Sequence, residues 1–537
     1  MTRPGFRGIV HHATHRAEQA TGRNSPIFVV RRLSGLSKLN GSMESSSLLF
    51  RRISICTRIL GLLCLALQVL AQTPQQDEWA TLSTRAEAAY QRGAYAESQR
   101  LYASALVLAE QFGPHDERLA ATLSNVATSD RALGRYAEAE KLYLRAIDIL
   151  RASSRSESGQ MAAVLNDLAG IYRTNARYAE SESTYREALA IVERQLGVES
   201  AGVALVLSNL GALDQDQGKY DAARQLYERA LSMGERVLGP DHPDVAGTLT
   251  HLGDLLRRQW HLQDAEPLYQ RAIAIREKAL GPDHPQLAES LNALALLYRV
   301  QERYADAEPL YRRSLEISQR SMGPTHPRVA VALNNLGELA ADQGKYAEAK
   351  QLYERAIAIW EKSLGPDDPD LAAGLSNLAS LYVAHRKYSK AEQLYQRAFQ
   401  IDTARFGPTH FRLARDLNNL ATLYYFRHQL GQAETFLQKS IAIYERLLGP
   451  DSPTLADPLL SLAALYVTEE RYPEAVALYR RAVPLRERVM GADHPRLAQA
   501  LESYALALRK TEDYAEAEKI AARATFIRVR MALRSGQ

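Results

Sequence analysis

Histidine is the commonest protein ligand for transition metals, and in this sequence it recurs at one spacing. One linker position holds His242, His284, His326 and His494, and the equivalent place before Phe411 holds His410. A zinc ion needs its ligand atoms at about 2 Å. Equivalent residues of neighbouring helix pairs are separated by on the order of 10 Å for each helix diameter. The spacing therefore predicts no metal site, and we expect these side chains and the neighbouring aspartates to cap helix N-termini.

Asparagines form a second recurring pattern, in the middle of predicted helices. One column holds Asn125, Asn209, Asn335, Asn377 and Asn419, and the column before it holds Asn166, Asn292, Asn334 and Asn418. Asparagine is a mediocre helix former that prefers caps, so its recurrence there requires a reason. One interpretation is that each amide, which both donates and accepts hydrogen bonds, bonds to the neighbouring helix and locks one repeat to the next.

Signatures of catalysis are missing. The sequence has no Gly-rich phosphate loop, no HExxH and no GxSxG nucleophile elbow. Its two cysteines, Cys56 and Cys64, both lie near the N-terminus. The rest of the chain therefore has no disulfide, thiolate metal site or catalytic cysteine. We predict that the protein is not an enzyme and holds no cofactor or metal.

The elements that position these columns are pairs of helices in a 42-residue unit, clearest in Gly281–Met322. Gly281-Pro282 ends the preceding helix, and Pro285 suits the first turn of the next. Apolar residues at spacings of three and four predict one helix from about 285 to 301 and a second from about 304 to 322. Neither helix could bury its apolar side alone, so neighbouring pairs must stack.

The spacing is kept through most of the chain. Glycines 42 or twice 42 residues apart begin the linkers, at Gly113, Gly197, Gly239, Gly281, Gly323, Gly365, Gly407, Gly449 and Gly491. Tyrosine or leucine begins each second helix, from Tyr95 and Tyr136 to Tyr514, which predicts eleven helix pairs. Alanines recur where the helices approach closely, and most of the 27 tyrosines fall in repeat columns and are expected in the core.

The segment Asn209–Leu231 (NLGALDQDQGKYDAARQLYERAL) carries Leu-Gly, Gly-x-Tyr, Ala and Tyr-x-x-Ala in an order that resembles the tetratricopeptide repeat. The GPDHP linker and the 42-residue period resemble the kinesin light chain subfamily of these repeats. The resemblance covers about Asp77 to Leu533. It implies an all-α, right-handed superhelical solenoid.

The resemblance also implies a function for the asparagines. In the proteins that these repeats resemble, the asparagine column faces a concave groove and holds the backbone of an extended peptide. The expected function is a non-catalytic scaffold that binds a partner protein or peptide in that groove. The predicted binding residues are Asn125, Asn209, Asn334, Asn335, Asn377, Asn418 and Asn419. Two alternatives stay open: a regulatory or sensing component of a multi-protein signalling or enzyme system, and a cytoplasmic adaptor like the kinesin light chains.

The N-terminal residues indicate export. Residues 1–42 are a basic leader or a misassigned start, and a signal peptide is predicted over 43–71. Its uncharged stretch Ile59–Ala71 has 13 residues, short of the about 20 that span a bilayer. We expect a linker over 72–76, the solenoid over 77–533 and a tail over 534–537. The predicted location is periplasmic or secreted, and the alternative is an uncleaved anchor formed by residues 59–71.

The charge distribution limits the class of partner. The chain has a net charge of +4, but its first 58 residues hold ten basic and two acidic side chains. The remainder has a net charge of −4 with mixed signs, which argues against a nucleic-acid partner. A membrane is expected to be contacted only through an uncleaved signal segment.

Overall fold

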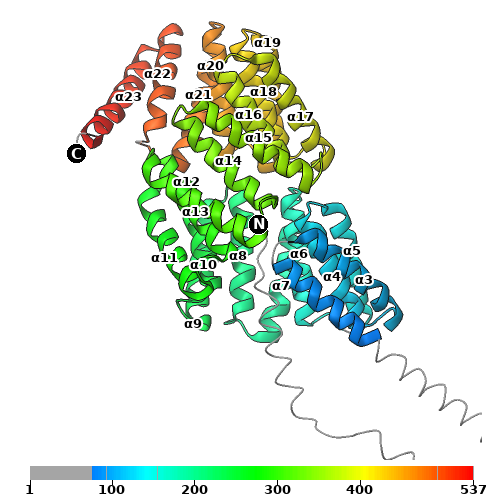
Figure 1. Cartoon of the computed structure of the whole chain (residues 1–537). Helices are drawn as coiled ribbons and strands as arrows, with labels where there is room; N and C mark the ends of the chain where they lie inside the picture. Colours follow the sequence, from blue (N-terminus) through cyan, green and yellow to red (C-terminus); the bar gives the residue numbers. More distant parts are fainter. Residues whose placement is uncertain (1–74, 92–93, 154, 493, 536–537) are drawn as a thin grey trace, which may run out of the picture.

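The computed structural model describes residues 75–91, 94–153, 155–492 and 494–535. Within these ranges all regular elements are helices, and they form eleven consecutive pairs (Figure 1). The predicted all-α solenoid is confirmed. The elements are a first helix over residues 75–91, α3 (Tyr95–Ala109), η4 (Glu110–Phe112), α4 (Glu117–Ala132), α5 (Tyr136–Ala152), α6 (Gly159–Thr174), α7 (Tyr178–Leu196), α8 (Ala201–Asp216), α9 (Tyr220–Leu238), α10 (Pro243–Arg258), α11 (Leu262–Leu280), α12 (Pro285–Val300), α13 (Tyr304–Met322), α14 (Pro327–Asp342), α15 (Tyr346–Ser363), α16 (Pro369–Ala384), α17 (Tyr388–Phe406), α18 (Phe411–Phe426), α19 (Leu430–Leu448), η5 (Pro453–Leu455), α20 (Ala456–Thr468), α21 (Tyr472–Met490), α22 (Pro495–Lys510) and α23 (Tyr514–Ser535).

The linker residues start and stop these helices as the sequence predicts. At the N-terminus of α12, the Nδ1 atom of His284 accepts a hydrogen bond of 3.2 Å from the backbone N–H of Gln286. His242, His326 and His410 cap α10, α14 and α18 in the same way, and Asp116 and Asp368 cap α4 and α16. The predicted capping role is confirmed for these histidines and for the aspartates that take their position. It is wrong for the neighbouring Asp241 and Asp283, which pair with Lys278 and Arg320 instead. Because Nδ1 accepts, the ring hydrogen lies on Nε2, which points away from the cap.

The core lies between the two helices of each pair and between neighbouring pairs. Alanines such as Ala139, Ala223 and Ala265 are fully buried where helices meet. A column of buried tyrosines packs against glycines of the first helices. A Cβ on Gly253 would lie 2.8 Å from the ring of Tyr269, so only glycine leaves room for the ring. This confirms that the tyrosines of this column are core residues.

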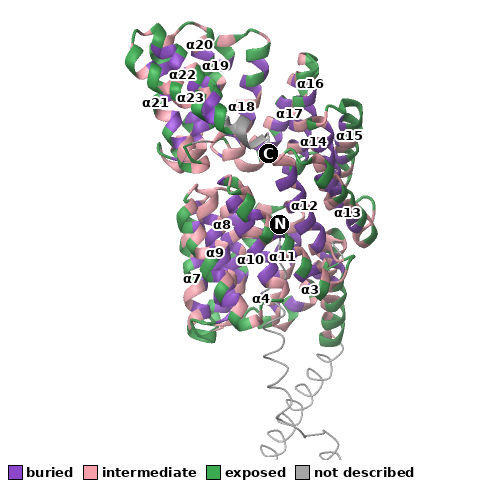
Figure 2. Ribbon diagram, turned by 90° about the vertical axis from the view of Figure 1, so that its left-hand side faces the viewer, coloured by how far each residue is buried: buried purple, intermediate pink, exposed green. Residues whose placement is uncertain are grey.

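The row of helix pairs coils into two tiers, one above the other in Figures 1 and 2. The lower tier runs from the first helix to α11, the upper tier runs from α14 to α23, and the pair α12–α13 joins them. We call the turn between the two helices of one pair a corner, and the segment between successive pairs a linker. Corners of the lower tier meet linkers of the upper tier.

Five corner–linker contacts hold the tiers together, each between residues five to six repeats apart. In the middle contact, Nε2 of His410 lies 2.9 Å from the carbonyl oxygen of Thr174 and donates to it. The remaining contacts are the rings of Trp260 and His494, whose centroids are 4.4 Å apart, the rings of Tyr95 and His326 at 5.6 Å, Gly134 against Asp368, and Gly218 against Ser452. Because of these contacts His326, Asp368, His410 and Ser452 are buried.

The predictions for the N-terminus concern residues that the structure does not describe. The basic leader (1–42), the signal peptide (43–71) and most of the 72–76 linker lie outside the described residues, and so do the last two residues of the predicted tail. The described part has no helix with the length and apolar character that a membrane crossing requires.

Candidate binding groove

The seven predicted asparagines lie on the first helices of five pairs. Asn125 lies on α4, Asn209 on α8, Asn334 and Asn335 on α14, Asn377 on α16, and Asn418 and Asn419 on α18. Asn334 is buried and the other six are partly exposed. The column therefore follows the row of first helices in both tiers.

Several of these amides bond to each other across neighbouring pairs. The Nδ2 atom of Asn209 donates to Oδ1 of Asn166 over 2.7 Å, and Nδ2 of Asn377 donates to Oδ1 of Asn334 over 3.1 Å. Asn377 also donates to Glu338 over 2.8 Å. These bonds tie one first helix to the next, which is the locking role that the sequence left open. We call these bonded pairs the asparagine ladder.

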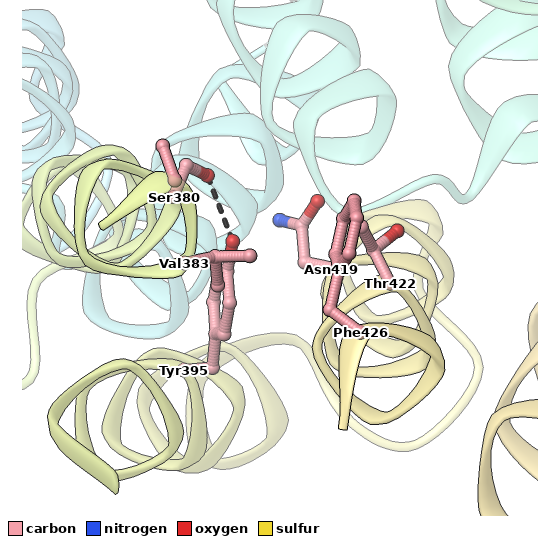
Figure 3. A pocket seen from close by; sticks show the side chains of 7 residues that line it. Ser380, Val383, Tyr395, Asn419, Thr422 and Phe426 are labelled. Atoms are coloured by element: carbon pink, nitrogen blue, oxygen red, sulfur yellow. Dashed lines mark hydrogen bonds between the residues drawn. The ribbon is translucent and has the colours of Figure 1, made fainter. Parts of the chain in front are cut away.

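Two adjoining hollows lie along the first helices of the upper tier. The first, of about 290 Å³, is lined by Ser380, Val383, Ala384, Tyr395, Asn419, Thr422 and Phe426 (Figure 3). The second, of about 310 Å³, is lined by Arg299, Glu338, Ala341, Asp342, Tyr346, Tyr353, Asn377, Ser380, Leu381 and Ala384. Ser380 and Ala384 border both, so Asn377 and Asn419 are brought to one continuous surface. Asn125 and Asn209 lie in the lower tier, away from it.

The two hollows differ in polarity. In the first, Val383 and the half-exposed ring of Phe426 present apolar surface, and the Asn419 amide points into the space between α16 and α18 (Figure 3). The hydroxyls of Ser380 and Tyr395 bond to each other at 2.8 Å. No hydrogen bond of the Asn419 amide occurs within the described residues, so its donors and acceptor face the hollow.

Charged side chains line the second hollow. Arg299 forms ion pairs with Glu338 and, at 3.6 Å, with Asp342. Burial raises the pKa of Asp342 and that of the Tyr353 hydroxyl above their ordinary values. A polar side chain of a ligand could exchange with this ion pair, whereas an apolar one would leave the charges unsatisfied.

An arginine column on the same helices was missed by the sequence reasoning. Arg131, Arg173, Arg257 and Arg299 stand at the ends of the first helices, in contact with Asp167, Asp216, Asp254 and Asp342. In the upper tier the column holds Val383, Tyr425 and Val467 on α16, α18 and α20, and arginine returns at Arg509 on α22. The 42-residue spacing of the arginines was the available signal. The first helices α4, α6, α10 and α12 therefore present paired charges at this position, and α16, α18 and α20 present apolar or aromatic groups.

One pair of carboxyl groups has a composition that would suit acid–base chemistry. Asp402 of α17 and Asp416 of α18 both lie 3.8 Å from Arg415. Burial raises the pKa of Asp416 to about 7, and it also raises that of Asp402. Their exposed fractions are 0% and 1%, so no substrate can reach them. The described residues contain no cluster of His, Cys, Asp and Glu that could hold a metal ion.

Three solved structures are similar to parts of this chain. BtubC (BKLC) from P. vanneervenii is 24% identical, with 43% of this chain and 90% of that chain covered and a TM-score of 0.34. A putative kinesin light chain with nearly identical TPR-like repeats from Podosopora anserina is 23% identical, with coverages of 38% and 98% and a TM-score of 0.33. A Rap protein complexed with competence and sporulation factor is 16% identical, with coverages of 69% and 98% and a TM-score of 0.48.

No curated protein matches the chain. The family model described as tetratricopeptide repeat matches residues 79–152, 160–233, 202–278, 261–320, 292–362, 328–404, 387–446, 412–488 and 454–527. These segments cover nearly all of the described helices. The chain, with its eleven stacked helix pairs, belongs to the tetratricopeptide repeat family.

Proposed function

We propose that the protein is a non-catalytic scaffold that binds an extended segment of a partner protein along the first helices of the upper tier. The observation that carries this proposal is the pair of adjoining hollows bordered by Asn377 and Asn419. Repeat solenoids present extended surfaces of this kind to partners. The binding residues in this proposal are the two predicted asparagines that reach the hollows, Asn377 and Asn419.

The chemistry of the hollows defines the segment that they fit. The Asn419 amide can donate to and accept from one peptide unit of an extended backbone. Val383 and Phe426 would enclose an apolar side chain, and the neighbouring hollow at Arg299 and Asp342 would take a polar one. Because the helices are already in place, the scaffold loses little conformational entropy on binding.

The test is selection of binders from a random peptide display library on the wild-type protein, followed by affinity measurement by fluorescence anisotropy. Asn419→Ala removes about 1.4 kcal/mol of backbone hydrogen bonding, so we expect about tenfold weaker binding of the selected peptides. Asn209→Ala is the matched control, because it removes the Asn166 bond in the lower tier and leaves the hollows intact. The control should lower the free energy of unfolding by about 1 kcal/mol without changing affinity.

Two outcomes would contradict the proposal that the groove binds a peptide. One is a selection that enriches no peptide, and the other is a peptide that binds wild-type protein and Asn419→Ala equally well. If Asn209→Ala weakens binding as much as Asn419→Ala, the site lies in the lower tier.

The proposal includes export of the scaffold through the signal peptide predicted over residues 43–71. It rests on the arginines at 51, 52 and 58 and on the uncharged stretch Ile59–Ala71. N-terminal sequencing of the protein from its cells is expected to give a start near Gln72. A start at Met1 or Met43 would leave residues 59–71 attached and would favour the anchored form instead.

A further inference from the structure

Each tier has a row of corners and a row of linkers, and the contact between the tiers uses only one of these two rows from each tier. The lower tier contributes its corners and the upper tier contributes its linkers. The linkers of the lower tier, with N-terminal caps Asp116, Ser158, Ser200, His242 and His284, therefore form one outer face of the molecule. The corners of the upper tier form the opposite face, with Gly344, Arg386, His428, Glu470 and Glu512 at their tips. We call these the linker face and the corner face.

Matched positions show that the corner face is uncovered. Gly134, at a lower-tier corner, is buried against Asp368, whereas a Cβ on Gly344, at the same position of the upper tier, would meet no atom within 4 Å. Tyr346 beside it is 43% exposed, and the corner residues Arg386, His428 and Glu470 are exposed. The corner face has the same backbone shape as the covered corners, because its tips share the positive φ of Gly134 and Trp260.

The linker face carries the same kind of groups that make the contact between the two tiers within one chain. In the covered linker of α18, His410 caps the helix through Nδ1 and donates from Nε2 to a corner carbonyl. His242 and His284 cap their helices through Nδ1 with the same geometry. Their Nε2 hydrogens therefore point out of the linker face, and they make no hydrogen bond within the described residues.

The repeat number places these two faces in register. The solenoid has eleven pairs, so the first helix of a second copy, placed after α23, would continue the 42-residue period. Inside the chain, each corner contacts a linker that lies five to six repeats later. If the same separation holds across the junction, linker caps of the second copy contact corners of the first. The five contacts would be Asp116 on Gly344, Ser158 on Arg386, Ser200 on His428, His242 on Glu470 and His284 on Glu512.

The charges of the two faces are complementary in this register. Lys345, Arg386 and Lys387 of the corner face would meet the linkers that carry Asp116, Glu157 and Glu199. Within the chain these acids pair with Arg118, Arg194 and Arg236, so the lysines and arginine of the other copy would share them. At the other end of the row, Glu470 and Glu512 would accept from the Nε2 hydrogens of His242 and His284. The acids beside these histidines are already paired, Asp241 with Lys278 at 2.6 Å and Asp283 with Arg320 at 3.0 Å.

We propose that copies of this chain associate head to tail, the linker face of one copy on the corner face of the next. The two faces are different surfaces, so the contact is heterologous, and it extends the superhelix without closing it. The occupant of each face is a second copy of this chain. The two surfaces adjoin at Tyr346, which lines the second hollow and lies beside the corner tip Gly344, but the five contacts use none of the asparagines of the groove.

The test is analytical ultracentrifugation and negative-stain microscopy of the protein purified after expression of the full chain. We expect the average mass to rise more than twofold with concentration, with rod-like particles of variable length. Lys345→Glu/Arg386→Glu/Lys387→Glu reverses the corner face, and Glu157→Lys/Glu199→Lys reverses the linker face. Each variant alone should keep the mass of one chain, and a mixture of the two should associate again, because intact and reversed faces both find complements.

The matched control is Lys141→Glu/Arg229→Glu/Lys439→Glu, which makes the same charge change at exposed helical positions away from both faces. It should associate like the wild type. Circular dichroism checks that each variant keeps its helix content, and Arg386→Glu alone, at an exposed corner, replaces the triple variant if that one unfolds. The proposal is overturned if the wild type keeps the mass of one chain at every concentration, or if neither face variant reduces association.

Discussion

The linkers of the lower and upper tiers have nearly the same sequence and very different surroundings. Pro282-Asp283-His284 caps α12 from the surface, and Pro408-Thr409-His410 caps α18 from a buried position against the lower tier. His284 is partly exposed and His410 is 2% exposed. Burial lowers the pKa of both imidazoles, and that of His410 falls to about 4. One local motif therefore serves as a cap in both tiers and as a joint between tiers in only one.

The difference shows what a repeat does not determine. The cap depends on residues two positions apart, so it forms wherever the motif occurs. The contact between the tiers joins residues five to six repeats apart. It therefore depends on the pitch of the superhelix, to which every intervening helix pair contributes. A small rotation per repeat, summed over the array, decides which linkers are covered.

The largest expected effect concerns a column that differs between the tiers. Val192 and Val206 are both buried in the lower tier, and the equivalent residues of the upper tier are Asp402 and Asp416. Burial raises the pKa of Asp416 to about 7, so the folded protein holds a proton that the unfolded chain loses at about pH 4. A raised carboxyl pKa means that stability falls as pH rises. We expect Asp416 to lower the free energy of unfolding by about 1.4 kcal/mol per pH unit between about pH 4 and pH 7, in addition to the effect of other buried acids.

Asp402→Val/Asp416→Val copies the lower-tier pair and should remove this slope. Urea unfolding at several pH values measures it in both proteins. A slope of the same sign should remain in the variant up to about pH 6, because burial raises the pKa of Asp368 to about 6, and the two proteins should differ in slope up to about pH 7. If the unfolding free energies of the two proteins changed with pH in parallel, the expectation would be contradicted. The carboxyl pair would then be ionised in the folded state and exposed to solvent.

The second effect separates the cap from the joint. His284→Ala and His410→Ala both remove an N-terminal cap, which costs about 1 kcal/mol of the free energy of unfolding. His410→Ala also removes the bond to Thr174 and the stacking on Phe406, whose ring centroid lies 4.2 Å away. We therefore expect a loss of about 3 kcal/mol for His410→Ala. Chemical denaturation gives both values, and hydrogen exchange should quicken at residues 174–178 in His410→Ala alone.

Most of the fold could be predicted from the sequence, because it is written in local spacing. The eleven pairs, the glycine stops, the histidine caps and the buried tyrosines depend on residues within one 42-residue unit. The corner contacts could not be predicted, since Trp260 and His494 or Thr174 and His410 carry no sign of each other in their own repeats. The asparagine column was found, but its bonding required the structure. Asn209 and Asn377 meet partners of the neighbouring column, whereas Asn419 faces a hollow because α16 has Ser376 where those partners are asparagines. Whether that amide binds a peptide stays a prediction.

The smallest expected effect uses two glycines at the same corner position. Gly134 and Gly344 have φ values of +74° and +73°, so alanine at either site is strained by about 1 kcal/mol. At Gly344 the new methyl group would meet open space, and at Gly134 it would lie 2.7 Å from Oδ2 of Asp368. Because the Asp368 carboxylate is itself buried and caps α16, it cannot move away without cost. We expect Gly134→Ala to lower the free energy of unfolding by about 1 kcal/mol more than Gly344→Ala does. The comparison belongs at concentrations where the protein has the mass of one chain, so that the corner face stays uncovered. Equal losses of unfolding free energy for the two variants would mean that the tiers separate in solution. The register proposed for the two outer faces, which is based on the contact between the tiers, would then have no support.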